Sequence, residues 1–225
     1  MSERKIFFPL WRIGLSAVWR ALGRPFDARY GVVTEGRRQP GEMQLVAGSP
    51  ADAYEYAPSP VRAFWLSVGA LRIDASRFAF IDYGSGMGRA LILAGLLPYR
   101  RIEGVEIAGE LNAIAGANIE RNFPGGIAGG RFALHTTEAT QYRIPSCPCV
   151  IYLFNPFGRD TLLKLADIIA ASYAAQPRPI YVVYVNPTLR TLFEQRGFKP
   201  VGQSRLHRFL DRRIPSGSAI FRLHA

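Results

Sequence analysis

An acidic residue and three glycines form the most distinctive chemical pattern in this chain. Asp82 is followed by Gly84, Gly86 and Gly88, so that a glycine stands at every second position. Glycine lets the backbone turn tightly and lets a ligand approach without a Cβ atom in the way. A helix that begins directly after such a loop has unpaired N–H groups that can face an electron-rich ligand atom. The pattern therefore predicts a loop that holds a ligand against its backbone.

The residues around this loop predict the elements that carry it. The apolar run 78–81 is typical of a buried strand and the apolar run 90–97 of a buried helix. Strand, glycine loop and helix in this order form the nucleotide site of doubly wound α/β folds. A dinucleotide fingerprint is excluded, because its third glycine or alanine would fall on Arg89 or Leu91. A Walker loop is excluded as well, because the tripeptide G-K-[ST] does not occur.

Further polar residues stand where the next three predicted strands end. We expect these strands at 101–107, 131–136 and 149–154. The residues concerned are Glu106 and Ile107 at the second strand, Glu138 and Ala139 after the third, and Asn155, Pro156 and Phe157 after the fourth. A carboxylate at the end of the second strand can accept hydrogen bonds from ribose hydroxyls.

In this order, the glycine loop and the strand ends resemble the motifs of the class I S-adenosylmethionine-dependent methyltransferases. The resemblance implies S-adenosylmethionine as the cofactor and no metal. It implies contacts to the methionine end from Asp82, Gly84, Ser85, Gly86 and Gly88, to the ribose from Glu106 with Ile107, and to the adenine from Glu138 and Ala139. It places Asn155, Pro156 and Phe157 at the reacting end, where Asn155 would hold a target nitrogen. Two positions depart from the family: it usually has Asp where Glu138 stands, and the second proline of its N-P-P-aromatic motif is missing here.

A second, shorter resemblance lies before the glycine loop. The segment Tyr56-Ala57-Pro58-Ser59 is similar to one in the bacterial-type lysine methyltransferases related to the mitochondrial ATP synthase c-subunit enzyme. In those enzymes the segment folds over the cofactor, which implies a cofactor contact for Tyr56. The alternative is an ordinary proline-rich entry to a helix.

The rest of the chain fits an α/β fold with a doubly wound, seven-stranded sheet, a terminal antiparallel β-hairpin and an N-terminal helical extension. Periodicity alone indicates only the doubly wound α/β sheet. We expect helices at 61–71, 110–122, 161–175 and 189–196, and further strands at 179–185, 198–210 and 218–223. We assign residues 1–60 to an amphipathic helix followed by a loop-rich lid, and residues 61–225 to the cofactor-binding domain.

The N-terminal segment is basic and amphipathic. Residues 9–22 are expected to form a helix. Together with Phe7, its apolar residues Trp11, Leu15, Val18, Trp19 and Leu22 fall on one helical face, which Arg12, Ser16 and Arg20 interrupt. Eight basic and three acidic residues in the first 38 give this segment +5 of the chain's net charge of +11. A solvated face explains the basic charge, and packing of the helix on the domain explains its apolar face. Contact of residues 6–22 with a membrane surface, or binding of an acidic partner such as RNA or an anionic protein, is the alternative.

Length and composition fit a single globular domain of this kind. The 225 residues, 48% of them hydrophobic, are enough for a sizeable core. No run reaches the roughly 18 apolar residues of a membrane span. Cys147 and Cys149 are too close for an ordinary disulfide, and no further Cys or His lies nearby to complete a zinc site. We therefore expect plain thiols in a reducing, cytoplasmic compartment.

We expect the chain to transfer a methyl group from S-adenosylmethionine to an acceptor that the sequence does not identify. The Asn-Pro-aromatic motif favours, weakly, an amine nitrogen such as a protein lysine. A scaffold protein that keeps the cofactor but has lost transfer remains an alternative. A nicotinamide-dependent oxidoreductase is a third class, and the glycine spacing argues against it.

Overall fold

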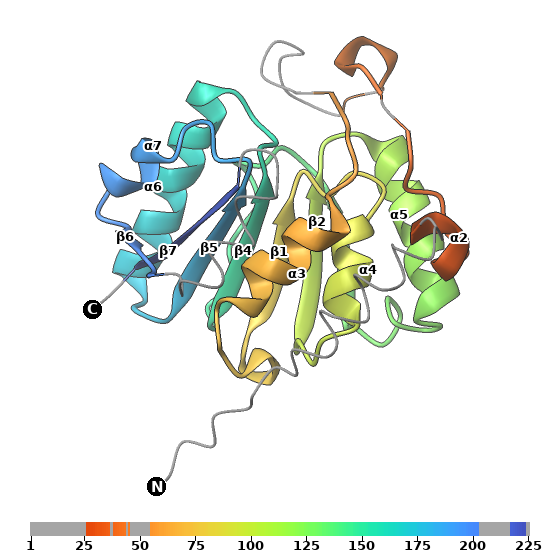
Figure 1. Ribbon diagram of the computed structural model, residues 1–225, viewed down its shortest axis with the longest axis horizontal. Helices are drawn as coiled ribbons and strands as arrows, with labels where there is room; N and C mark the ends of the chain where they lie inside the picture. The colour runs from red at the N-terminus through yellow and green to blue at the C-terminus, as the bar shows by residue number, and fades with distance from the viewer. Residues whose placement is uncertain (1–25, 37, 44, 46–54, 203–216, 224–225) are drawn as a thin grey trace, which may run out of the picture.

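A seven-stranded sheet organises the molecule (Figure 1). The computed structural model describes residues 26–36, 38–43, 45, 55–202 and 217–223. The strands lie in the order β3-β2-β1-β4-β5-β7-β6. The first five are parallel, whereas β7 runs antiparallel to both β5 and β6. The doubly wound, seven-stranded α/β sheet with antiparallel last strands is therefore confirmed.

The strands and helices alternate as the hydrophobic pattern predicts. The strands are β1 (Ala79–Tyr83), β2 (Arg101–Glu106), β3 (Phe132–Thr136), β4 (Cys149–Phe154), β5 (Ile180–Val185), β6 (Lys199–Pro200) and β7 (Ser218–Leu223). The helices are α2 (Phe26–Tyr30), α3 (Val61–Gly69), α4 (Arg89–Gly95), α5 (Gly109–Asn122), α6 (Arg159–Ala175) and α7 (Thr191–Glu194), with 3-10 turns η1 (Pro40–Glu42) and η2 (Ala75–Arg77). Among the described helices, none is long and apolar enough to cross a membrane.

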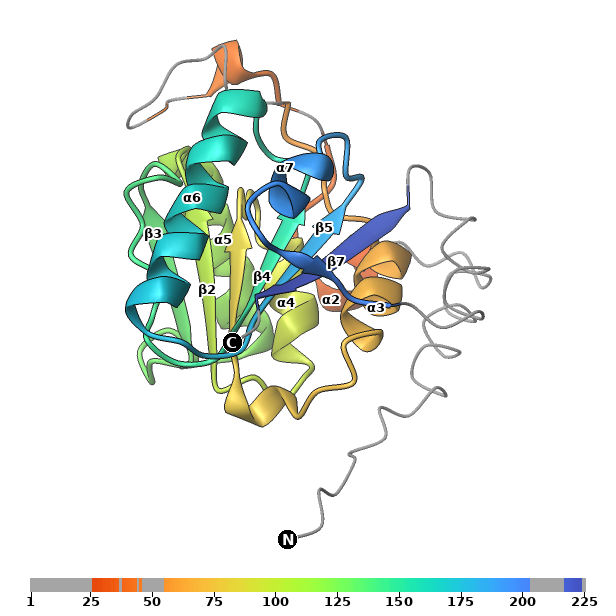
Figure 2. The same ribbon diagram turned by 90° about the vertical axis from the view of Figure 1, so that its left-hand side faces the viewer.

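Helices cover both faces of the sheet, as a parallel sheet requires. Helices α3, α4 and α5 lie on one face, and α6 and α7 lie on the other (Figures 1 and 2). The central strands are consequently continuous apolar runs, and every residue of β1 is buried. Helix α6 shows the complementary pattern, since its buried residues recur at three-to-four spacing on the side that faces the sheet.

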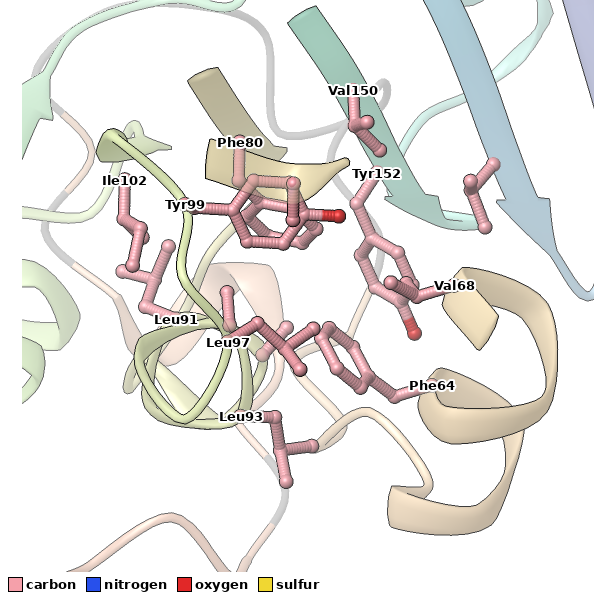
Figure 3. Close-up of a cluster of buried hydrophobic side chains, with 14 of the residues drawn as sticks. Phe64, Val68, Phe80, Leu91, Leu93, Leu97, Tyr99, Ile102, Val150 and Tyr152 are labelled. Carbon is pink, nitrogen blue, oxygen red and sulfur yellow. The ribbon is translucent and has the colours of Figure 1, made fainter. Parts of the chain in front are cut away.

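Aromatic side chains fill the core between α3, α4 and the sheet (Figure 3). Phe64 of α3 packs on Phe80 of β1 and on Tyr152 of β4, with ring centroids 5.8 and 5.5 Å apart. These rings fix the position of α3 and α4 relative to β1 and β4. The glycine loop joins β1 to α4, so this packing also sets the geometry of the loop.

The last part of the sheet is described only in part. Within the strand expected at 198–210, β6 contains Lys199 and Pro200, which pair with Arg222 and Phe221 of β7, and residues 203–210 lie outside the described residues. Proline donates no hydrogen bond to a ladder, so a strand that reaches it is confined to a sheet edge. The predicted hairpin turn and the predicted helix at 9–22 lie outside the described residues.

The described residues before α3 lie near the carboxyl-terminal edge of the sheet. Helix α2 lies beside α5, and residues 38–43 lie above the strand ends (Figure 1). Among them, the backbones of Arg38 and Tyr56 pair antiparallel, and Leu45 pairs with Ala108 at the start of α5. The described residues between 26 and 60 are called the lid below, and their role as a cover over a cofactor stays a prediction.

Candidate functional site

A cavity of about 480 Å³ lies at the carboxyl-terminal edge of the parallel strands. In open α/β sheets this edge is where ligands bind. Most of the residues that the sequence singled out line its wall. They are Tyr56, Gly84, Ser85, Glu106, Ile107, Glu138, Ala139, Asn155, Pro156 and Phe157. Asp82, in β1, and Gly86 and Gly88, in the β1–α4 connection, are not among the lining residues.

The glycine loop needs glycine at all three positions, because each has a positive φ and a different side chain packed close to it. Gly84, Gly86 and Gly88 have φ values of +74°, +52° and +83°, a region that other residues rarely adopt. A Cβ atom on Gly84 would lie 2.7 Å from the Pro156 side chain, and one on Gly88 would lie 3.0 Å from the Ala115 side chain. The missing Cβ atom at Gly84 thus lets Pro156, which follows β4, approach the loop. The missing Cβ atom at Gly88 lets α5 pack close to the start of α4.

Tyr56 covers the middle glycine. A Cβ atom on Gly86 would lie 2.2 Å from the Tyr56 ring, so the ring packs on the loop backbone itself. The Tyr56 hydroxyl donates a hydrogen bond of 2.7 Å to the carbonyl oxygen of Thr34. Burial is the main cause of a raised pKa for Tyr56, so the hydroxyl stays protonated. The lid is therefore tied to the glycine loop at this side chain.

Glu106 holds the turn between β2 and α5 and also holds the glycine loop. One carboxylate oxygen accepts the N–H of Gly86 at 2.8 Å, and the other accepts the N–H groups of Ile107 and Ala108 at 2.9 and 3.0 Å. Burial raises the pKa of Glu106, and these three hydrogen bonds oppose that rise. The oxygen that faces Gly86 keeps one lone pair for a ligand hydroxyl.

Asp82 is a buried acid next to the loop. Its side chain is only 3% exposed, and among the described residues no hydrogen bond to its carboxyl group is found. Burial, and secondarily the charge of Glu106, raises the pKa of Asp82 to about 8. At neutral pH this carboxyl group therefore carries a proton, and a cation placed beside it would favour its ionisation.

An arginine that the sequence reasoning missed anchors the lid. Arg89, the first residue of α4, is only 7% exposed and lines the cavity. Its Nε donates to the Thr34 hydroxyl at 2.7 Å, and its Nη2 pairs with Glu35 at 2.6 Å and with Asp27 at 3.3 Å. Its position directly after the third glycine, in an otherwise apolar helix, was the available signal.

Asp27 completes this ion-pair network on the lid side. Burial opposes ionisation of Asp27, but hydrogen bonds from Thr34 and Glu35 and the charge of Arg89 outweigh it and hold the pKa of Asp27 below its usual value. The carboxylate is therefore ionised and paired. Asn118 of α5 adds hydrogen bonds to both backbone groups of Val33 and to the Met87 carbonyl. Residues 26–36 are consequently fixed to the back of the glycine loop.

Two asparagines stand side by side at the other end of the cavity. Asn155 follows β4 and Asn186 follows β5, and both line the cavity. The sequence reasoning gave Asn155 a role and gave Asn186 none. The Asn155 carbonyl oxygen accepts hydrogen bonds from the hydroxyls of Tyr184 and Thr188, both at 2.8 Å. The signal for Asn186 was the repeat of the Asn-Pro pair after the next parallel strand.

Comparisons with known proteins identify the fold and no close relative. No family model and no curated protein sequence matches the chain. Among solved structures, the methyltransferase domain of bacterial CtHen1 matches with a TM-score of 0.51 and 14% identity over 73% of this chain and 100% of that one. The Burkholderia thailandensis 1,6-didemethyltoxoflavin-N1-methyltransferase, solved with S-adenosylhomocysteine, matches with a TM-score of 0.50 and 14% identity over 72% and 77%.

A third structure matches over a smaller share of its own length. The pyocyanin biosynthetic protein PhzM matches with a TM-score of 0.50 and 14% identity over 71% of this chain, which spans about half (53%) of PhzM. At these identities the matches show the fold. The chain has the class I S-adenosylmethionine-dependent methyltransferase fold, with the sheet order given above.

Proposed function

We propose that this chain binds S-adenosylmethionine in the cavity at the sheet edge and transfers its methyl group to an amine acceptor. The observation that carries the proposal is the placement of the glycine loop, Glu106, Glu138 and Asn155 around one cavity in this fold. The cavity volume of about 480 Å³ falls in the range of small-ligand and cofactor sites, roughly 300–1,000 Å³.

The residues around the cavity fit this cofactor. Ser85 lines the cavity, and its buried hydroxyl has no hydrogen-bond partner among the described residues. Asp82 does not line the cavity, so it can act on a methionine ammonium only through its charge, and a cation bound nearby would favour its ionisation. The Glu106 oxygen that faces Gly86 can accept a hydrogen bond from a ribose hydroxyl, and Glu138 and Ala139 line the same cavity, which supports the expected adenine contacts.

The charges around the cavity favour a cationic cofactor and an amine. Glu55, Glu106 and Glu138 line the wall. Among the lining residues that the structure describes, Arg89 is the only basic one, and its charge is paired with Glu35 and Asp27. An acidic wall attracts cations and repels anionic acceptors such as carboxylates. We therefore propose an amine acceptor, a protein lysine among the candidates.

When bound, S-adenosylmethionine supplies a methyl group on a positively charged sulfur, so its leaving group needs no further activation. The protein aligns the nucleophile and keeps water out. Tyr56, Pro58 and Met43 of the lid line the cavity, and Phe157 adds an aromatic side chain to its wall. The Tyr56–Thr34 hydrogen bond and the Arg89 ion pairs hold the lid in place.

Methyl transfer from labelled cofactor tests the proposal. The protein is incubated with S-adenosylmethionine labelled in the methyl group and a lysate from a strain that lacks it, and the products are fractionated. We expect label in an amine-containing product that depends on the added protein. Binding of the cofactor without any incorporation would instead support the scaffold alternative.

A further inference from the structure

Two equivalent corners lie at the acceptor end of the cavity. In the register of β4 and β5, Phe154 pairs with Val185, so the next residues, Asn155 and Asn186, leave the sheet side by side. Both have a left-handed backbone, with φ values of +41° and +53°, and both are followed by proline. Asparagine is one of the few residues other than glycine that tolerates this conformation. Their side chains nevertheless have different surroundings.

The Asn155 side chain is used by the fold. Its carbonyl oxygen accepts the hydroxyl of Tyr184, on β5, and the hydroxyl of Thr188, in the connection that follows β5. A carbonyl oxygen has two lone pairs, so both are occupied. The Asn155 side chain can therefore offer a methyl acceptor only the N–H donors of its amide. It cannot accept a hydrogen bond from an amine while it makes these two contacts.

The Asn186 side chain has no such role. Its backbone is fixed, because its N–H donates to the carbonyl of Gly217 and its own carbonyl accepts the N–H of Thr188. Its side-chain amide is half-buried, lines the cavity, and makes no hydrogen bond with the residues that the structure describes. A rigid backbone thus presents an amide carbonyl that a ligand in the cavity can use.

We infer that Asn186 contacts the nucleophile of the acceptor and that Asn155 is a positioning residue. The inference rests on the proposed methyl transfer. The Asn186 carbonyl oxygen accepts a hydrogen bond from an N–H of the neutral amine, which turns the nitrogen lone pair toward the methyl group. The lone pair forms the new N–C bond, the C–S electron pair returns to sulfur, and the methylated nitrogen releases one proton to solvent.

Two matched variants separate the roles. Asn155→Gly and Asn186→Gly each remove the side chain at a positive φ, which glycine adopts without strain. Because both variants add the same flexibility to the unfolded chain, the difference between them reports the side chains. Asn186→Asp keeps a carbonyl-type oxygen and serves as the conservative variant. Melting temperature, cofactor affinity and the rate of label transfer into the lysate acceptor are measured for each.

We expect Asn155→Gly to melt at a lower temperature than the wild type, because it loses two hydrogen bonds. It should reduce the rate of methyl transfer less than tenfold. Asn186→Gly should melt at a higher temperature than Asn155→Gly and bind S-adenosylmethionine with unchanged affinity. It should transfer methyl groups about ten to a thousand times more slowly, the scale of a lost positioning contact. Asn186→Asp should recover the rate to within about tenfold of the wild type, because the accepting oxygen is kept.

Three results would overturn the inference. The first is equal transfer by wild type and Asn186→Gly, and the second is an Asn186→Gly melting loss as large as that of Asn155→Gly. The third is a slow Asn155→Gly beside a normal Asn186→Gly, which would return the acceptor contact to Asn155. If the wild type binds cofactor but transfers no label, the proposed transfer itself fails and this inference falls with it, whatever the variants do.

Discussion

The buried acid beside the glycine loop makes a sharp prediction about pH. Asp82 is 3% exposed, and burial followed by the charge of Glu106 raises its pKa to about 8. In the unfolded chain the same group has a pKa near 3.9. The Asp82→Asn variant keeps the shape of the side chain and removes its titration. The difference between the two proteins therefore isolates this one group.

The sign follows from where the proton is held. Between about pH 4 and pH 8 the folded wild type keeps the Asp82 proton and the unfolded chain does not, so the stability of the wild type falls as pH rises. One proton corresponds to about 1.4 kcal/mol per pH unit. From about pH 5 to pH 8 the wild type should lose about 4 kcal/mol relative to Asp82→Asn, and the difference should be constant above the folded pKa.

Urea denaturation of both proteins across this pH range measures the difference directly. Other titrating groups are common to both proteins and cancel. We expect the two stability curves to diverge steadily toward pH 8, with the variant the more stable protein at high pH. Parallel curves would refute the reasoning, because they would mean that Asp82 titrates alike in the folded and unfolded chain.

Two further variants test the contacts that build the cavity. Glu106→Ala should weaken cofactor binding by roughly 1.5–3 kcal/mol and should also lower stability by a similar amount, because the Gly86, Ile107 and Ala108 N–H groups lose their acceptor. Calorimetry and denaturation measure the two losses, and an unchanged dissociation constant would place the ribose contact elsewhere. Gly86→Ala should lower the melting temperature through the clash with the Tyr56 ring, and adding Tyr56→Ala should recover part of the loss. A double variant no better than Gly86→Ala alone would argue against that contact.

The parts of the fold that the sequence predicts are those with strong local patterns. The continuous apolar run of β4 and the three-to-four spacing of α6 each specify one element, and both are found where expected. Because parallel strands end at one edge of a sheet, the residues that follow them can be grouped from the sequence alone. Glu106 and Asn155 line one cavity for that reason.

The parts that could not be predicted depend on contacts between distant segments. Arg89 looks like an ordinary helix residue until Asp27 and Glu35, more than fifty positions earlier, are brought beside it. The contact between Tyr56 and Gly86 likewise joins the lid to the loop.

Calorimetric titration with S-adenosylmethionine tests the central claim most directly. The wild-type protein is titrated with S-adenosylmethionine, with S-adenosylhomocysteine and with NAD under the same conditions. The account predicts saturable one-to-one binding of the first two and none of NAD, since the glycine loop lacks the dinucleotide spacing. Absence of binding at millimolar S-adenosylmethionine, or saturable binding of NAD in its place, would contradict it.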